Sequence, residues 1–185
     1  MFIKMVKGDI TSKIEVPSEV EVKVEGKIVS VKGPKGELKR EFKHKNIKIV
    51  NEEGLAVVAK QGTKREKKNV FTITSHIKNM IEGVTEGFNY KLKICSSHFP
   101  MNVSIKDGEC VIKNFLGEKI PRKAKILEGV NAKVEGDLVI LDGINKEYVG
   151  QSAANIEQST RITNRCRRVF QDGVFIIEKN GKNMI

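Results

Sequence analysis

The sequence predicts an α+β protein of two tandem duplicated domains, each a mainly antiparallel β-sheet with one packed α-helix. Three observations lead to this fold class: residues 22–37 recur in related form at 103–118, apolar and charged residues alternate around both copies, and a helical pattern follows each copy. The 185 residues, 39% of them hydrophobic, are sufficient for two small cores. We place the domains at 1–83 and 84–185.

Each copy of the repeat begins with a β-hairpin. Residues 22–37 read VKVEGKIVSVKGPKGE and residues 103–118 read VSIKDGECVIKNFLGE, so that Val22 pairs with Val103 without a gap. A turn containing Gly, EG or DG, separates the two alternating runs of each copy. Because side chains alternate across a strand, one face of each sheet is expected to meet a core and the other to meet solvent.

Further strands follow each hairpin. In the first half, IKIV at 47–50 and GLAVVA at 54–59 predict two strands. In the second half, strands are expected near 124–128, 132–135 and 138–141.

One helix is expected after the strands of each half. In the first half, apolar residues recur at helical spacing over 70–84, and Glu82–Gly83 is expected to stop the helix. In the second half, Asn145 is expected to cap a helix over 146–159. The apolar face of this helix contains Val149, Ala153 and Ile156. Each domain is therefore predicted to place its sheet first and its helix last.

The chain is strongly basic. It has 34 Lys and Arg against 23 Asp and Glu, a formal net charge of +11. This favours a polyanionic partner, nucleic acid first and an acidic membrane surface second. Three cysteines without a close pair, no apolar leader and no membrane-spanning stretch indicate an intracellular protein of the cytosol with reduced thiols and passage through the nucleus.

Enzymatic chemistry finds little support. His44, His76 and His98 are scattered, and CSSH at 95–98 has the spacing of half a zinc site with no second pair. Phosphate-binding glycine motifs are missing, and the carboxylates alternate with lysines instead of clustering. We therefore predict no catalytic residue, no metal, no cofactor and no small-molecule substrate.

The segment 149–168, VGQSAANIEQSTRITNRCRR, combines uncharged hydrogen-bonding groups with a cluster of arginines. Arginine neutralises phosphates, and Gln, Asn, Ser and Thr bond phosphate oxygens and 2′-hydroxyls, which favours RNA. The alternative is a solvated helix with arginines near its negative end, and Glu147 and Glu157 argue against the whole surface being a contact face. On chemical grounds we predict RNA contacts at Lys146, Gln158, Arg161, Arg165, Arg167 and Arg168.

A family resemblance covers nearly the whole chain. GQSAANIEQSTRITNRCRRVFQDGVFIIEKNG resembles the C-terminal motif of the universal large-subunit ribosomal protein family numbered six in bacteria and nine in eukaryotes. GPKGEL, NMIEGVTEGFNYKLKI, SHFPMNVSI and NFLGEKIPRKAKI match in order, and TNRCRRVFQDG resembles the eukaryotic or archaeal form.

The resemblance implies a duplicated pair of α+β domains and a structural role in the large ribosomal subunit. It further implies that the second domain binds large-subunit rRNA near the sarcin–ricin loop and the stalk base, close to other ribosomal proteins and to the place where translational GTPases dock. By motif match, the rRNA contacts are expected at Lys113, Asn114, Lys119, Gln151, Ser152 and Asn155. The alternative from a different class is a protein–protein adaptor that adds partner strands to exposed sheet edges.

Overall fold

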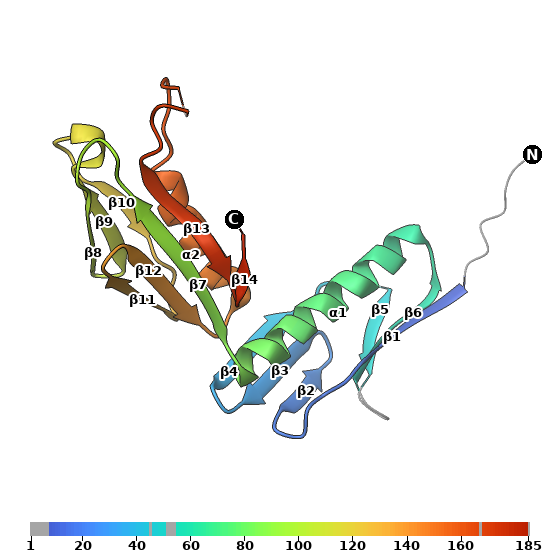
Figure 1. The fold of residues 1–185 in the computed structure, drawn as a ribbon. Coiled ribbons are helices and arrows are strands. Elements are labelled where there is room, and N and C mark those ends of the chain that lie inside the picture. Colours follow the sequence, from blue (N-terminus) through green and yellow to red (C-terminus); the bar gives the residue numbers. More distant parts are fainter. Residues whose placement is uncertain (1–7, 45, 51–54, 167, 185) are drawn as a thin grey trace, which may run out of the picture. The chain divides into compact units, whose positions relative to one another are not determined.

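The chain forms two compact units. The computed structural model describes residues 8–44, 46–50, 55–166 and 168–184. Unit 1 comprises Met1–Glu86 and unit 2 comprises Gly87–Ile185. Each contains antiparallel sheets and one long helix (Figure 1), which confirms the duplicated α+β fold class.

Unit 1 consists of two three-stranded sheets and a helix. Its elements are β1 (Gly8–Ile14), β2 (Glu21–Glu25), β3 (Ile28–Gly33), β4 (Gly36–Glu41), β5 (Ile47–Val50), β6 (Leu55–Gly62) and α1 (Lys64–Thr85). One sheet has the order β1-β6-β5 and the other β2-β3-β4, with antiparallel neighbours throughout. The strands at 47–50 and near 54–59 are confirmed, except Gly54, which lies outside the described residues.

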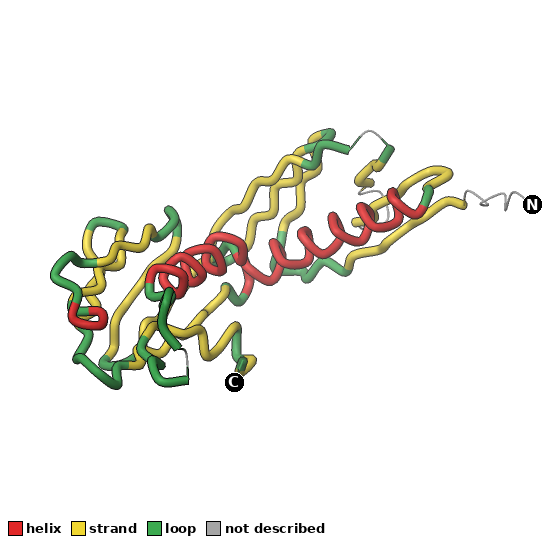
Figure 2. Tube along the Cα trace, turned by 90° about the horizontal axis from the view of Figure 1, so that it is seen from above, coloured by secondary structure: helices red, strands yellow, loops and turns green. Residues whose placement is uncertain are grey.

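The helix α1 covers the strands of unit 1. It packs against β1, β3 and β6 (Figure 2), and Val70, Ile73 and Ile77 are buried on its inner face. Burying each such side chain contributes about 1.5–3 kcal/mol. At its N-terminus the backbone N–H of Thr63 donates to the carboxylate of Glu66 at 2.9 Å, which satisfies a donor that the helix leaves unpaired.

Unit 2 repeats this arrangement and adds to it. Its elements are β7 (Phe88–Cys95), β8 (Asn102–Lys106), β9 (Glu109–Lys113), the 3-10 turn η1 (Phe115–Gly117), β10 (Arg122–Lys125), β11 (Val130–Glu135), β12 (Leu138–Gly143), α2 (Lys146–Ser159), β13 (Gly173–Lys179) and β14 (Lys182–Asn183). The sheets have the orders β10-β9-β8 and β11-β12-β7-β13-β14. The helix buries Val149, Ala153 and Ile156, and the Asn145 side chain accepts a bond from the Glu147 N–H at 3.0 Å. The predicted helix and its cap are confirmed.

The strand pairing shows how closely the two units correspond. In the first hairpin Glu21 lies opposite Lys32, and in the second Asn102 lies opposite Lys113, each 81 positions later. The order β5-β6-β1 likewise matches β11-β12-β7. The repeat in the sequence is therefore a repeat of hydrogen-bond register.

Two local expectations were wrong. Glu82–Gly83 does not stop α1, which continues to Thr85 because buried Val84 still packs on unit 1. Unit 2 also does not end with its helix: the chain returns as β13 and pairs with β7, where Val174 joins the core. The apolar alternation after Gly173 had not been interpreted as a strand.

Candidate nucleic-acid interface

Three loops of unit 2 meet at one end of its sheets. They are residues 96–101, 114–121 and 160–172, and we call the surface that they form the three-loop surface; Arg167 lies outside the described residues. In Figure 1 they lie at the top of unit 2, beyond the ends of β7, β9 and β13.

The first two loops are joined by Asn114. Its side chain donates to the Pro100 carbonyl at 3.0 Å, and its backbone has a φ of 59°. Asn is one of the few residues that adopt this left-handed conformation readily. Gly117 has a φ of 79°, a conformation that glycine adopts without strain, and it lies beside the ring of Phe99. The backbone turn at η1 is therefore held by contacts with the neighbouring loop.

Arg122 joins the second loop to the end of α2. Its guanidinium donates to both carboxylate oxygens of Glu118, at 2.6 and 2.8 Å, and to the Ser159 carbonyl at 2.7 Å. It also lies over the ring of Phe115, 4.2 Å from the centroid. Hydrogen bonds from Arg122 lower the pKa of Glu118, with a smaller contribution from the positive charge of Arg165. A helix end leaves carbonyls without partners, and Arg122 supplies one.

Asp172 joins the first loop to the third. Its carboxylate is buried and accepts bonds from the backbone N–H groups of Ser97 at 2.6 Å and His98 at 3.0 Å. The His98 ring nitrogen Nδ1 lies 2.5 Å from the same carboxylate. Burial alone would raise the pKa of Asp172, but the hydrogen bonds from His98 and Ser97 outweigh burial and hold that pKa well below its usual range.

Ser97, His98 and Asp172 do not form a nucleophilic triad. In such a triad the serine and the carboxylate meet opposite nitrogens of the imidazole. Here the Ser97 hydroxyl, at 3.1 Å, and the Asp172 carboxylate approach the same nitrogen, Nδ1. The His98 ring instead stacks on Phe170 at 4.7 Å between centroids, and the Arg165 guanidinium lies 4.8 Å from the Phe170 centroid. The arrangement clamps two loops together.

The charge of the three-loop surface follows from these contacts. Its two acidic residues, Glu118 and Asp172, are engaged by Arg122 and by Ser97 and His98. The exposed cations on the surface or at its edge are Lys113, Lys119, Arg161, Arg165 and Arg168. The structure therefore presents positive charge on loops that are braced from behind.

The structure brings some of the predicted site residues together. Lys113, Asn114, Lys119, Arg161, Arg165 and Arg168 lie on or beside the three-loop surface. On α2, Gln151 and Gln158 are exposed. Asn155 lies between them and donates to the Lys125 carbonyl at 3.0 Å while accepting from Gln151 at 2.9 Å, so its amide ties the helix to β10.

Two predicted residues do not fit this surface. Ser152 is fully buried, and its hydroxyl accepts a bond from the Leu127 N–H at 3.0 Å, so the prediction that it contacts RNA is corrected. Lys146 is the first residue of α2, about 20 Å along the helix from its end. Its amine lies 5.2 Å from the centroid of the Phe88 ring.

Arg122 and Asp172 do not stand out in the sequence, and His98 was considered there only within the half zinc spacing of CSSH at 95–98. The partners of Asp172 lie 74 and 75 positions away, and the Ser159 carbonyl lies 37 positions from Arg122. The local signal for the ion pair of Glu118 and Arg122 is that these opposite charges stand four residues apart in the sequence.

Other sites are not evident in the described part of the chain. It contains no cluster of three or more His, Cys, Asp or Glu side chains suited to a metal ion. None of its helices has the length and apolar character needed to cross a membrane. Cys95, Cys110 and Cys166 are free thiols, and burial raises the pKa of Cys110 to about 11.

The fold and this surface define a class: a basic protein of two homologous α+β units, one of which presents braced cationic loops suited to a polyanion. Comparison with known proteins makes the class specific. The family model "Ribosomal protein L6" matches residues 16–87 and 99–173, and the chain belongs to this family.

Two archaeal relatives carry the name "large ribosomal subunit protein uL6". The protein of Methanococcus vannielii is 51% identical over 174 residues, which cover 94% of this chain and 96% of the relative. The protein of Ignicoccus hospitalis is 50% identical over 169 residues, 88% of this chain and 91% of the relative. These matches confirm the family resemblance and its eukaryotic or archaeal type.

Proposed function

We propose that this protein is a non-catalytic structural constituent of the large ribosomal subunit and that unit 2 binds large-subunit rRNA through the three-loop surface. The observation that carries the proposal is that Glu118 and Asp172 are engaged by contacts within unit 2, while Lys119, Arg161 and Arg165 are exposed on the same loops. Rigid cationic loops suit the fixed phosphate positions of a folded RNA. Family membership and the names of the relatives support the ribosomal setting.

The same proposal includes a position and neighbours. The rRNA bound is the region near the sarcin–ricin loop and the stalk base, and the protein supports the region where translational GTPases bind. Neighbouring large-subunit proteins near the stalk base are its other partners. It resides on cytosolic ribosomes, with transit through the nucleus and nucleolus during assembly in a cell that has them.

Association with the large subunit is tested by sedimentation. A native extract is separated on a sucrose gradient, with and without ribonuclease, after a high-salt wash. The protein is expected to migrate with large subunits through the wash and to leave them after ribonuclease. A peak at the top of the gradient, or a complex unaffected by ribonuclease, would contradict the proposal and favour the protein–protein adaptor.

The position on the rRNA is tested from within the three-loop surface. Cys166 is exposed in the third loop, whereas Cys110 is buried, so a thiol-reactive iron chelate can be attached at Cys166. Replacing Cys95 with Ser removes the remaining partly accessible thiol. Hydroxyl radicals from the labelled protein in reconstituted subunits are expected to cut rRNA around the sarcin–ricin loop and stalk base. The control carries the chelate on Lys67→Cys in a chain with Cys95→Ser and Cys166→Ser. Cuts from Cys166 confined to other rRNA regions would remove the proposed position.

A further inference from the structure

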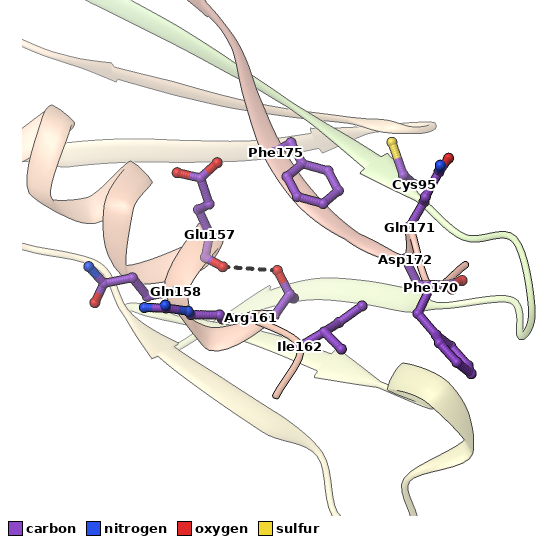
Figure 3. Close-up of a pocket in the computed structure, with 10 residues that line it drawn as sticks. Cys95, Glu157, Gln158, Arg161, Ile162, Phe170, Gln171, Asp172 and Phe175 are labelled. Atoms are coloured by element: carbon purple, nitrogen blue, oxygen red, sulfur yellow. Dashed lines mark hydrogen bonds between the residues drawn. The ribbon is translucent and has the colours of Figure 1, made fainter. Parts of the chain in front are cut away.

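A groove opens in unit 2 beside the end of α2 and the start of β13. Its volume is about 590 Å³, within the range of roughly 300–1,000 Å³ that small-molecule sites occupy. It adjoins the third loop, and Gln158 and Arg161 contribute to its lining. Figure 3 shows the ring of Phe175 on one side of the opening and Ile162 on another. The groove thus has enough volume for a flat ring system.

The groove is held open by contacts behind it. The Thr160 hydroxyl accepts a bond from the Val174 N–H at 3.0 Å and donates to the Glu157 carbonyl at 3.1 Å, which fixes the helix end against β13. At Gly173, a Cβ would lie 2.9 Å from the Phe175 ring, so the ring rests against bare backbone. Phe175 is nevertheless 40% exposed, so part of its ring is accessible to a ligand.

The polar groups at the groove suit a nucleotide. Arg161 supplies a cation and Gln158 an amide, and in Figure 3 both side chains extend away from Phe175. On β7, exposed Lys93 lies directly across from Phe175 in the sheet, so their side chains share one face. Glu157 adds a carboxylate, one oxygen of which lies 3.5 Å from the Ile176 N–H. Two carboxylate oxygens offer about four acceptor positions, so capacity for a ligand donor remains.

We propose that this groove holds a single unpaired RNA base, stacked on Phe175, with guanine preferred. The proposal rests on the RNA-binding role proposed for unit 2 and deepens it. Arg161 and Lys93 would meet the flanking phosphates, while the guanine N1–H and amino group donate to Glu157. Uracil fits less well because its single N–H lies between two carbonyl oxygens that the carboxylate repels. A carboxylate beside an aromatic ring and two cations therefore favours a base over an apolar ligand.

Hairpin RNAs that share one stem test this assignment with the full chain. One carries a single bulged guanine, one a bulged uracil, and one no bulge; affinities are measured by fluorescence anisotropy at low salt. The bulged-guanine hairpin is expected to bind about tenfold more tightly than the hairpin without a bulge, the size expected for one base stacked on an aromatic ring. Phe175→Leu should remove this preference and leave the affinity for the plain hairpin unchanged. Glu157→Gln should remove the preference for guanine over uracil.

A second readout does not depend on affinity. A hairpin with a bulged 2-aminopurine should lose fluorescence when it binds the wild-type protein, because the 2-aminopurine then stacks on Phe175. It should keep its fluorescence with the Phe175→Leu variant. The matched control is Phe71→Leu, the same change at an exposed phenylalanine on α1 of unit 1, which should behave as wild type. Equal, salt-dependent affinity for all three hairpins with no quenching would overturn the base site and leave RNA binding intact. Absence of binding to every hairpin at low salt would contradict the RNA-binding role itself, and the base site with it.

Discussion

Units 1 and 2 have corresponding strands and helices, but some of the segments that connect these elements differ in length. The link from β1 to β2 and the link from β7 to β8 correspond residue for residue, since Ile14 and Cys95 end the first strands 81 positions apart. The link after the hairpin differs: Pro34 and Lys35 suffice between β3 and β4, whereas residues 114–121 with η1 connect β9 to β10. The helices differ too, with 22 residues in α1 and 14 in α2.

The differences gather at one end of unit 2. Its longer hairpin link and the segment that follows its shorter helix supply two of the three loops of the cationic surface. Both units nevertheless use a cation near the start of the strand that follows the hairpin to meet the end of their helix: Lys35 immediately precedes β4, and Arg122 is the first residue of β10. Lys35 donates to the Glu86 carbonyl, and Arg122 donates to the Ser159 carbonyl. The comparison teaches that the shared framework provides stability, while the segments found in unit 2 alone carry the proposed binding role.

The largest effect is expected on RNA affinity. Replacing Lys119, Arg161 and Arg165 together with Ala should weaken binding to large-subunit rRNA about 100-fold and lower the log–log salt slope by about 2–3, because each lost phosphate contact removes close to one unit. Filter binding over a salt series measures both quantities.

The matched control removes the same charge from unit 1. Lys64, Lys67 and Lys68 are exposed on α1, and replacing all three with Ala changes the net charge equally. We expect less than about a threefold loss of affinity, the effect of general electrostatics alone. An equal loss in the two triple variants would mean that the units do not differ in binding.

The next effect is on the acid stability of unit 2. The pKa of Asp172 is depressed, so its contribution is complete above the unfolded value of about 3.9 and is lost as pH falls through the lower folded value. Asp172→Asn should lower the free energy of unfolding of unit 2 by about 2 kcal/mol at neutral pH and remove this part of the acid dependence. Amide hydrogen exchange of peptides from β7 and β13, read by mass spectrometry, resolves unit 2 from unit 1.

Glu66 in unit 1 is the comparison for Asp172, because its pKa is also lowered. The Thr63 hydroxyl and backbone N–H hold the pKa of Glu66 at about 2, but its side chain is solvated. Glu66→Gln should therefore change the acid dependence of α1 peptides much less than Asp172→Asn changes those of β7 and β13. The reverse order would show that burial does not set the size of the effect.

The smallest effect concerns the two helix ends. Arg122→Ala should destabilise unit 2 by about 1–2 kcal/mol, since it leaves the part-buried Ser159 carbonyl and the Phe115 ring without their partner. Lys35→Ala removes an exposed contact in unit 1 and should cost less than about 0.5 kcal/mol. Urea unfolding followed by the same peptide exchange measures both, and Arg122→Lys should restore only part of the loss because lysine lacks the planar fork. A larger loss of stability from Lys35→Ala than from Arg122→Ala would contradict the expectation that Arg122 makes the stronger contact with its helix end.

The sequence predicted those parts of the fold that local pattern determines. The two hairpins, the strand at 47–50, and the cap at Asn145 all depend on residues close in the chain, and all are confirmed. Strand β13 pairs with β7, which lies far away in the sequence. The short apolar run of β13 was therefore not sufficient to predict a strand. Gly83 did not end α1 because tertiary packing of its neighbour Val84 outweighed the low helix propensity of Gly.

The candidate site shows the same division. Exposed cations such as Lys119 and Arg161 could be chosen from composition and motif, since charge and side-chain chemistry are local properties. Ser152 could not be judged correctly, because a small polar residue on an amphipathic helix fits either face until its partner, the Leu127 N–H, is known. Asp172 was missed because its role depends on two donors in another loop.

The position of β13 also has a consequence for synthesis on the ribosome. Unit 1 pairs β1 with β6 and can complete its sheets and helix once residue 85 has left the exit tunnel. In unit 2, β7 lies between β12 and β13, and Asp172 immediately precedes β13. A nascent chain therefore folds unit 1 first. It cannot anchor the loop at Ser97 and His98 until the last segment emerges, so the three-loop surface is complete only after translation of the chain is nearly finished.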